Sequence, residues 1–146
     1  MHKNKLLFCA LGLFAPGTGL NVFYLKGLSS IWAWLQMLGL FLGILGWKLL
    51  AASQMSSALG WIMVSAGFIS LQSSWLTTIV YGLRPDEKWD AQFNSGSGQQ
   101  SNSGWLVVLC VIISLMIGAA VLMSGLAIAF EQHFLSQIEA ARKISQ

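Results

Sequence analysis

Charged side chains are scarce in this sequence. Only 9% of the 146 residues are Asp, Glu, Lys or Arg, whereas 55% are hydrophobic. An ordinary soluble domain carries about 25% charged residues, so this chain has too few to cover a surface that faces water. The scarcity fits a surface that faces lipid, where Lys, Arg or Asp at a helix centre costs about 2.5–3.5 kcal/mol. We therefore expect an all-α integral membrane protein.

Residue types that carry chemistry are also few. The long apolar segments contain no Asp, Glu or His, whereas catalysis in a membrane usually needs titratable groups that converge. Cys9 and Cys110 lie inside apolar runs, where cysteine behaves as a small hydrophobe, and they match no zinc or redox motif. The cations are scattered, which favours topology signals over a nucleic-acid footprint. The sequence thus predicts a non-enzyme with no catalytic residue, metal ligand, cofactor or nucleic-acid partner.

Four apolar segments are long enough to cross a hydrocarbon core of about 30 Å. They are residues 6–25, 30–51, 58–83 and 105–130. Trp32 and Trp34 at the start of the second segment, and Trp47 at its end, form the aromatic-belt pattern of a membrane span. We expect a small bundle of four transmembrane helices.

The chain divides into four parts on this interpretation. A helix pair with a Gly-rich turn occupies residues 1–52, and a third transmembrane helix occupies 53–83. A polar periplasmic loop covers residues 84–104, and 105–146 hold the fourth helix with an amphipathic cytoplasmic tail.

The first segment is broken at Pro16-Gly17-Thr18-Gly19. Pro16 removes a backbone donor, and Gly17 and Gly19 weaken a helix. Two shapes are open: a kinked span, or a short helix followed by a tight turn and an interfacial piece around Phe23 and Tyr24. In either shape, irregular backbone at membrane depth must be buried in protein.

Small residues recur at helical spacing in the other segments. Such residues let membrane helices approach closely, either within one chain or between two chains. The predicted helix-packing residues are Gly39, Gly43, Ala66, Ser70, Ser74, Ser114, Gly118 and Gly125. We expect them to pack within the chain. Gln72 is expected to form an interhelical hydrogen bond.

The polar stretch 84–104 has two parts. Residues 84–90 are charged, and 94–104 have the Ser, Gly, Gln and Asn composition of a flexible linker. The acids could hold a divalent cation, but their mixture with Arg84 and Lys88 favours local ion pairing on a solvated loop. We predict that a partner contacts this stretch and the aromatic pair of the first segment. The candidate partner-binding residues are Phe23, Tyr24, Arg84, Asp86, Glu87, Trp89 and Asp90.

The fourth segment continues into a polar tail with one apolar face. Phe130, Phe134 and Ile138 share that face, and Glu139 and Arg142 lie opposite. The tail is expected to be either the end of one long helix that leaves the bilayer or a short interfacial helix. It either stays solvated or docks a partner.

The cations suggest an orientation. With four spans and the N-terminus inside, five cations are cytoplasmic and three are outside. The cytoplasmic set is Lys3, Lys5, Lys48, Arg142 and Lys143, and the outer set is Lys26, Arg84 and Lys88. The positive-inside rule then predicts that both termini are cytoplasmic. We also expect the N-terminal apolar run to stay in the mature protein, although it resembles a signal peptide.

The first fifty residues resemble a TM2 domain, a family that pairs two membrane helices across a short Gly-rich turn followed by an aromatic element. The resemblance rests on the apolar run after Lys3-Asn4-Lys5, the turn at Pro16-Gly17-Thr18-Gly19, Phe23-Tyr24-Leu25-Lys26-Gly27 and the helix start Ile31-Trp32-Ala33-Trp34-Leu35. The family usually has Gly-Gly in the turn and a His or an Asp-Arg pair before Phe-Tyr, whereas this chain has Pro16-Gly17 and Asn21-Val22.

The stretch from Tyr81 to Asp90 resembles an extension of some proteobacterial members of that family. The resemblance implies a multi-pass protein of the bacterial cytoplasmic membrane and no established reaction.

Three functions fit these features. The first is a non-enzymatic membrane module that packs against or scaffolds other membrane proteins, with the lipid bilayer and a membrane protein or a homo-oligomer as partners. The second is an accessory subunit of a larger inner-membrane enzyme complex. The third is a small oligomeric channel or carrier, because discontinuous helices line solute sites in transporters.

Overall fold

The computed structural model describes residues 2–96 and 100–144, and this part of the chain contains helices and no strand. The elements in chain order are α1 (Lys5–Phe14), α2 (Leu20–Lys26), α3 (Ile31–Ala52), α4 (Ala58–Gly82), α5 (Asp86–Phe93) and α6 (Trp105–Ile144). The part of the predicted linker at 97–99 lies outside the described residues.

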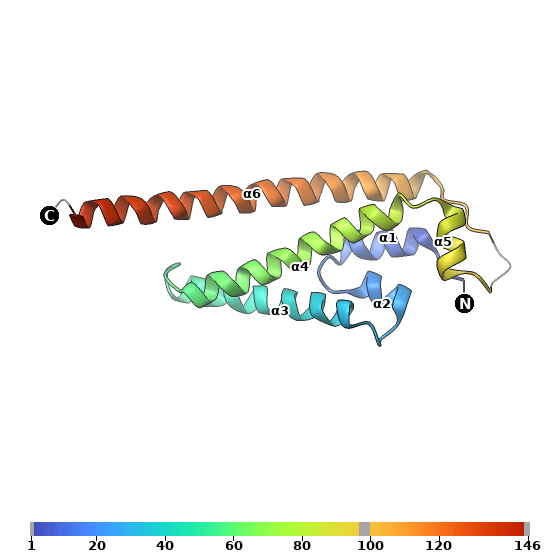
Figure 1. Ribbon diagram of the computed structural model, residues 1–146, viewed down its shortest axis with the longest axis horizontal. Helices are drawn as coiled ribbons and strands as arrows, with labels where there is room; N and C mark the ends of the chain where they lie inside the picture. The colour runs from blue at the N-terminus through green and yellow to red at the C-terminus, as the bar shows by residue number, and fades with distance from the viewer. Residues whose placement is uncertain (1, 97–99, 145–146) are drawn as a thin grey trace.

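Three of these helices, α3, α4 and α6, are long and apolar enough to cross a membrane. The helices α3 and α4 form an antiparallel pair, and α6 lies along the other side of α4 (Figure 1). The Ser57 side chain caps α4 by accepting from the Gly60 N–H at 3.1 Å. The predicted helical segments at 30–51, 58–83 and 105–130 are confirmed.

The prediction of four spans is not confirmed, because the first segment turns back. The helix α1 has 10 residues, or about 15 Å, half the thickness of a hydrocarbon core. After the turn, α2 runs back toward the start of α1 (Figure 1). The Lys3 ammonium donates to the Leu25 carbonyl, and the Asn4 N–H donates to the Tyr24 hydroxyl at 2.7 Å. Of the two predicted shapes, the structure has the short helix with a tight turn.

The turn between α1 and α2 needs glycine. Gly17 and Gly19 have φ of +76° and +73°, a region that side chains with a Cβ rarely adopt. A Cβ on Gly19 would also collide with the Ala33 carbonyl of α3. The turn is covered by α4, where the Ser70 hydroxyl oxygen lies 3.3 Å from the Gly17 carbonyl oxygen. This contact meets the requirement that irregular backbone at membrane depth be buried in protein.

The predicted polar loop contains a helix, α5, that folds under the N-terminus. Its Trp89 is completely buried, packs against Phe8 with ring centroids 5.7 Å apart, and donates from Nε1 to the Lys3 carbonyl at 3.1 Å. We call the end of the bundle that holds α5 and the start of α1 the N-terminal end.

The described chain therefore begins and ends at opposite ends of the molecule. The contacts of Lys3 and Asn4 hold the first residues at the N-terminal end, whereas α6 leads away to Ile144 at the other end (Figure 1). The expectation that both termini share one side, opposite the polar loop, is not supported. It depended on a first segment that crosses the bilayer.

The last helix extends far beyond the rest of the bundle. With 40 residues, α6 is about 60 Å long, and its final turns pass the connection between α3 and α4 (Figure 1). Of the two predicted forms of the tail, the structure has one continuous helix.

Candidate functional site

Close contact between α3 and α4 depends on small residues. A Cβ on Gly43 would lie 2.6 Å from the Gly67 Cα, and one on Gly39 would lie 2.9 Å from the Ser70 Cβ and 3.2 Å from the Ala66 carbonyl oxygen. Backbones this close gain van der Waals contact, which drives helix association in lipid. These predicted packing residues therefore lie between two helices of the same chain.

The contact between α4 and α6 contains the predicted packing residues Gly118 and Gly125. Gln72 Nε2 donates to the Gly118 carbonyl at 3.1 Å, which is the interhelical hydrogen bond expected for this residue. Ser74 and Ser114 are completely buried, and Gly125 lies under the Phe68 ring. These contacts pack α6 against α4.

A polar cluster closes the N-terminal end. The Lys5 side chain is only 5% exposed and pairs with Asp86 at 3.0 Å, 81 positions along the chain. Burial alone would raise the pKa of Asp86, but hydrogen bonds from Ser103 and the Lys5 ammonium and the charge of Lys5 hold it below its usual value. Asp86 of α5 therefore binds both Lys5 of α1 and Ser103, which precedes α6.

A second carboxylate extends the same cluster. Asp90 accepts from the Ser101 N–H at 2.6 Å, from the Ser101 hydroxyl at 2.5 Å and from the Asn94 amide at 2.8 Å. These hydrogen bonds lower the pKa of Asp90. Asn94 also accepts from the Lys3 N–H at 2.7 Å. The local ion pairing predicted within residues 84–90 is not found among the described residues, because Asp86 pairs with the distant Lys5 instead.

Most of the predicted partner-binding residues are used within the chain. Trp89 is buried, Phe23 packs edge-on against Trp34 with ring centroids 5.3 Å apart, and Arg84 lies over the Tyr81 ring at 5.4 Å. Among the seven predicted partner-binding residues, Glu87 on α5 has an exposed side chain. From the sequence, Lys5 was predicted to be a topology signal and not a structural ion-pair partner, because no local pattern reveals a partner 81 positions away.

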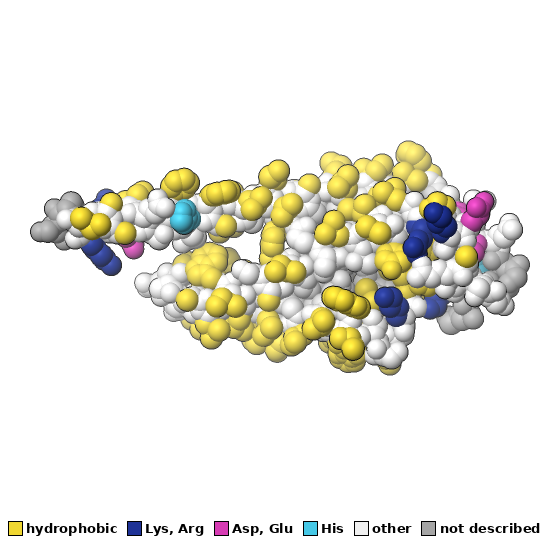
Figure 2. Space-filling model, viewed as in Figure 1, with side chains coloured by type: hydrophobic (Ala, Val, Ile, Leu, Met, Phe, Trp, Pro, Cys, Tyr) yellow, Lys and Arg dark blue, Asp and Glu magenta, His cyan; other side chains and the backbone are white. Residues whose placement is uncertain are grey.

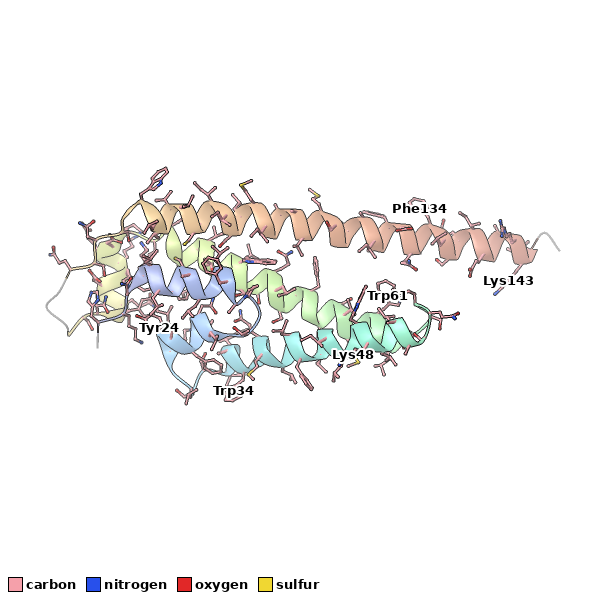
Figure 3. The ribbon with its side chains drawn as sticks, turned by 180° about the vertical axis from the view of Figure 1, so that it is seen from behind. Tyr24, Trp34, Lys48, Trp61, Phe134 and Lys143 are labelled. Carbon is pink, nitrogen blue, oxygen red and sulfur yellow. The ribbon has the colours of Figure 1, made fainter. Side chains whose placement is uncertain are left out.

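The projecting part of α6 carries an apolar face that the chain does not cover. Phe130, Phe134 and Ile138 are 61%, 59% and 53% exposed. Figure 3 shows Phe134 about level with the tip of the α3–α4 pair, past Lys48 and Trp61, and Lys143 well beyond that tip. Figure 2 shows hydrophobic side chains over much of the bundle, with Lys and Arg gathered toward the N-terminal end and at the tip of α6. We call Phe130, Phe134 and Ile138 the projecting face.

Within the described residues, no three His, Cys, Asp or Glu side chains gather to hold a metal ion. The ion pair at the N-terminal end joins structural segments, and its oxygens already accept hydrogen bonds.

Comparison with known proteins gives no relative: no family model, no curated protein and no solved structure matches this chain.

Proposed function

We propose that the protein is a non-enzymatic integral membrane module that packs against or scaffolds another membrane protein through the projecting face of α6. The observation that carries the proposal is the exposure of Phe130, Phe134 and Ile138 on a helix that continues past its own bundle. Full burial of each such side chain stabilises a complex by about 1.5–3 kcal/mol. A lone helical extension of this length is marginal in water, so a partner would also stabilise the tail.

A pull-down in mild detergent tests this proposal. The tagged full-length protein is expected to retain a membrane-protein partner, and the double variant Phe134→Ser/Ile138→Ser is expected to lose it. Gln132→Ala/Ser136→Ala is the matched control, because these residues lie on the opposite face of the same turns. Recovery of a bare monomer under several mild conditions, or equal loss in both variants, contradicts the proposal.

We also propose three spans with the N-terminus and α5 in the cytoplasm. We call α1, α2 and the turn between them the hairpin. Because it lies at the N-terminal end, five cations share that side: Lys3, Lys5, Lys26, Arg84 and Lys88. The other side has three: Lys48, Arg142 and Lys143. The positive-inside rule assigns the side with five cations to the cytoplasm. The projecting face is then on the outer side. The resemblance of the first fifty residues to a TM2 domain supports a bacterial cytoplasmic membrane.

A small oligomeric channel or carrier is the second candidate. The re-entrant hairpin favours it, because broken helices line the solute sites of transporters. Asn21 of α2 is completely buried and its Nδ2 has no hydrogen-bond partner in the described structure. Flux into proteoliposomes tests this function, and no flux across a broad panel of solutes removes it.

A further inference from the structure

A groove opens between α2, α3 and α4 near the N-terminal end. Its volume is about 690 Å³, within the range of about 300–1,000 Å³ typical of small-molecule sites. The apolar part of its lining is Val22, Leu25, Leu35, Leu38, Leu42 and Ile69. Leu35 and Ile69 are 51% and 66% exposed, so the groove is open on the surface that faces lipid. An acyl chain is the apolar occupant that this environment supplies.

The groove has a polar patch just inside the start of α3. The Gln36 side chain donates from Nε2 to the Ser73 hydroxyl at 3.1 Å. The backbone carbonyl of Gln36 accepts from the Ser70 hydroxyl at 2.5 Å. Its Oε1 is buried and has no hydrogen-bond partner in the described structure. Gln36 is five residues beyond Ile31, or about 7–8 Å along α3. At this depth a phospholipid brings ester carbonyls, which only accept hydrogen bonds, and bound water, which can donate to the free Oε1 and bridge it to an ester.

Positive charge lies at the mouth of the groove. Lys26 lines the groove and is exposed, and no acid within the described residues forms an ion pair with it. The Lys3 ammonium, which donates to the Leu25 carbonyl, is close by. Trp32 also lines the mouth, as is typical of an indole at the membrane interface. Two ammonium groups at headgroup level complement a phosphate.

We propose that this groove binds an anionic glycerophospholipid. Lys26, assisted by Lys3, binds the phosphate, Gln36 faces the glycerol region, and one acyl chain lies along Leu35, Leu38 and Ile69. The groove is formed by α2, α3 and α4, and it is separate from the projecting face of α6. Lipid binding therefore goes beyond the proposed scaffold function and does not depend on it.

Native mass spectrometry of the full-length protein tests the proposal. The protein is released from nanodiscs that contain equal amounts of phosphatidylglycerol and phosphatidylcholine, and the retained lipids are counted. The wild type is expected to retain phosphatidylglycerol in preference. Lys26→Gln is expected to reduce that preference about fivefold, which corresponds to about 1 kcal/mol for one lysine near a membrane surface. Lys88→Gln, which removes a charge at the same end but outside the groove, is expected to retain the preference.

A second variant tests the groove itself. Leu35→Trp fills the acyl-chain path and is expected to abolish retention of phosphatidylglycerol. Leu28→Trp, at an exposed position outside the groove lining, is expected to leave that retention unchanged. Equal retention of both lipids by the wild type, or equal effects of Lys26→Gln and Lys88→Gln, overturns the proposal. Recovery of a polypeptide in place of lipid, lost in Leu35→Trp, also overturns it.

Discussion

At the contact between α3 and α4, the absence of a side chain on Gly43 sets how closely two backbones approach. Since a Cβ there would lie 2.6 Å from the Gly67 Cα, we expect Gly43→Ala to lower the free energy of unfolding by about 1–3 kcal/mol. At Gly118 a Cβ would meet its nearest atom, the Trp75 Cβ, at 3.5 Å, so Gly118→Ala is expected to stay within about 0.5 kcal/mol. Thermal unfolding in detergent measures both, and equal effects contradict this account.

The ion pair between Lys5 and Asp86 predicts a pH dependence. Because the folded state lowers the pKa of Asp86, its contribution to stability is complete above the unfolded value of about 3.9 and is lost as pH falls through the folded value. We expect Asp86→Asn to unfold at a lower temperature near pH 7. It is also expected to lose less stability than wild type as the pH falls below about 4.

The neighbouring acids define the control for this measurement. Asp90 also has a lowered pKa, so some acid sensitivity remains in Asp86→Asn. Glu87 is exposed on the same helix, and Glu87→Gln is expected to behave as wild type. If Asp86→Asn and wild type lose equal stability on acidification, the ion pair does not stabilise the N-terminal end.

Spacing along a helix was a good guide to individual residues, and charge was a poor one. Gly39 and Gly43 were identified because a helix places residues four apart on one face, and Gln72 because it is a polar side chain in an apolar segment. The structure brings all three against neighbouring helices. The pairing of Lys5 with Asp86 joins residues 81 positions apart. Only the tertiary path of α1 and α5 brings them together, so no local pattern could predict it.

Among the elements, the re-entrant hairpin depends most on backbone geometry. Gly19→Ala combines a positive φ with a collision at the Ala33 carbonyl, a strain of about 1–3 kcal/mol. We expect the hairpin to open more often and expose Cys9 of α1, which is completely buried. In a Cys110→Ala background, maleimide labelling of Cys9 should become about 5–30 times faster, the factor for one or two kcal/mol.

A matched substitution separates this effect from general disruption. Leu20, next in sequence, is 45% exposed, and Leu20→Ala is expected to leave the labelling rate of Cys9 unchanged. Unchanged labelling in Gly19→Ala would mean that the turn tolerates a Cβ and that the hairpin is held by other contacts.

Hydropathy predicted the long helices well and the hairpin poorly. The structure has α3 at Ile31–Ala52 and α4 at Ala58–Gly82, against predictions of 30–51 and 58–83. Residues 6–25 have the same apolar character, but hydropathy does not record whether a chain continues or turns back. That choice depends on the positive φ of Gly17 and Gly19 and on the contact with Ser70 of α4.

For the whole molecule, the α1–α2 hairpin changes which segments lie at the same end of the bundle. A spanning first segment would separate the N-terminus from residues 84–104. The structure instead joins them through Asn94, which accepts from the Lys3 N–H, and through Asp86, which pairs with Lys5. The cation-rich side is then the N-terminal end, and α6 carries the projecting face to the opposite side.

Cysteine labelling from one side of the membrane distinguishes the two topologies. In a Cys9→Ala/Cys110→Ala background, His2→Cys, Asn102→Cys and Ser136→Cys report the N-terminus, the polar loop and the tail. With a re-entrant hairpin, an impermeant maleimide labels the first two from the same side and Ser136→Cys from the other. With four spans, His2→Cys and Ser136→Cys share a side and Asn102→Cys is opposite. Labelling of His2→Cys together with Asn102→Cys, from the inner face in inverted vesicles, would also establish the orientation that the five cations favour.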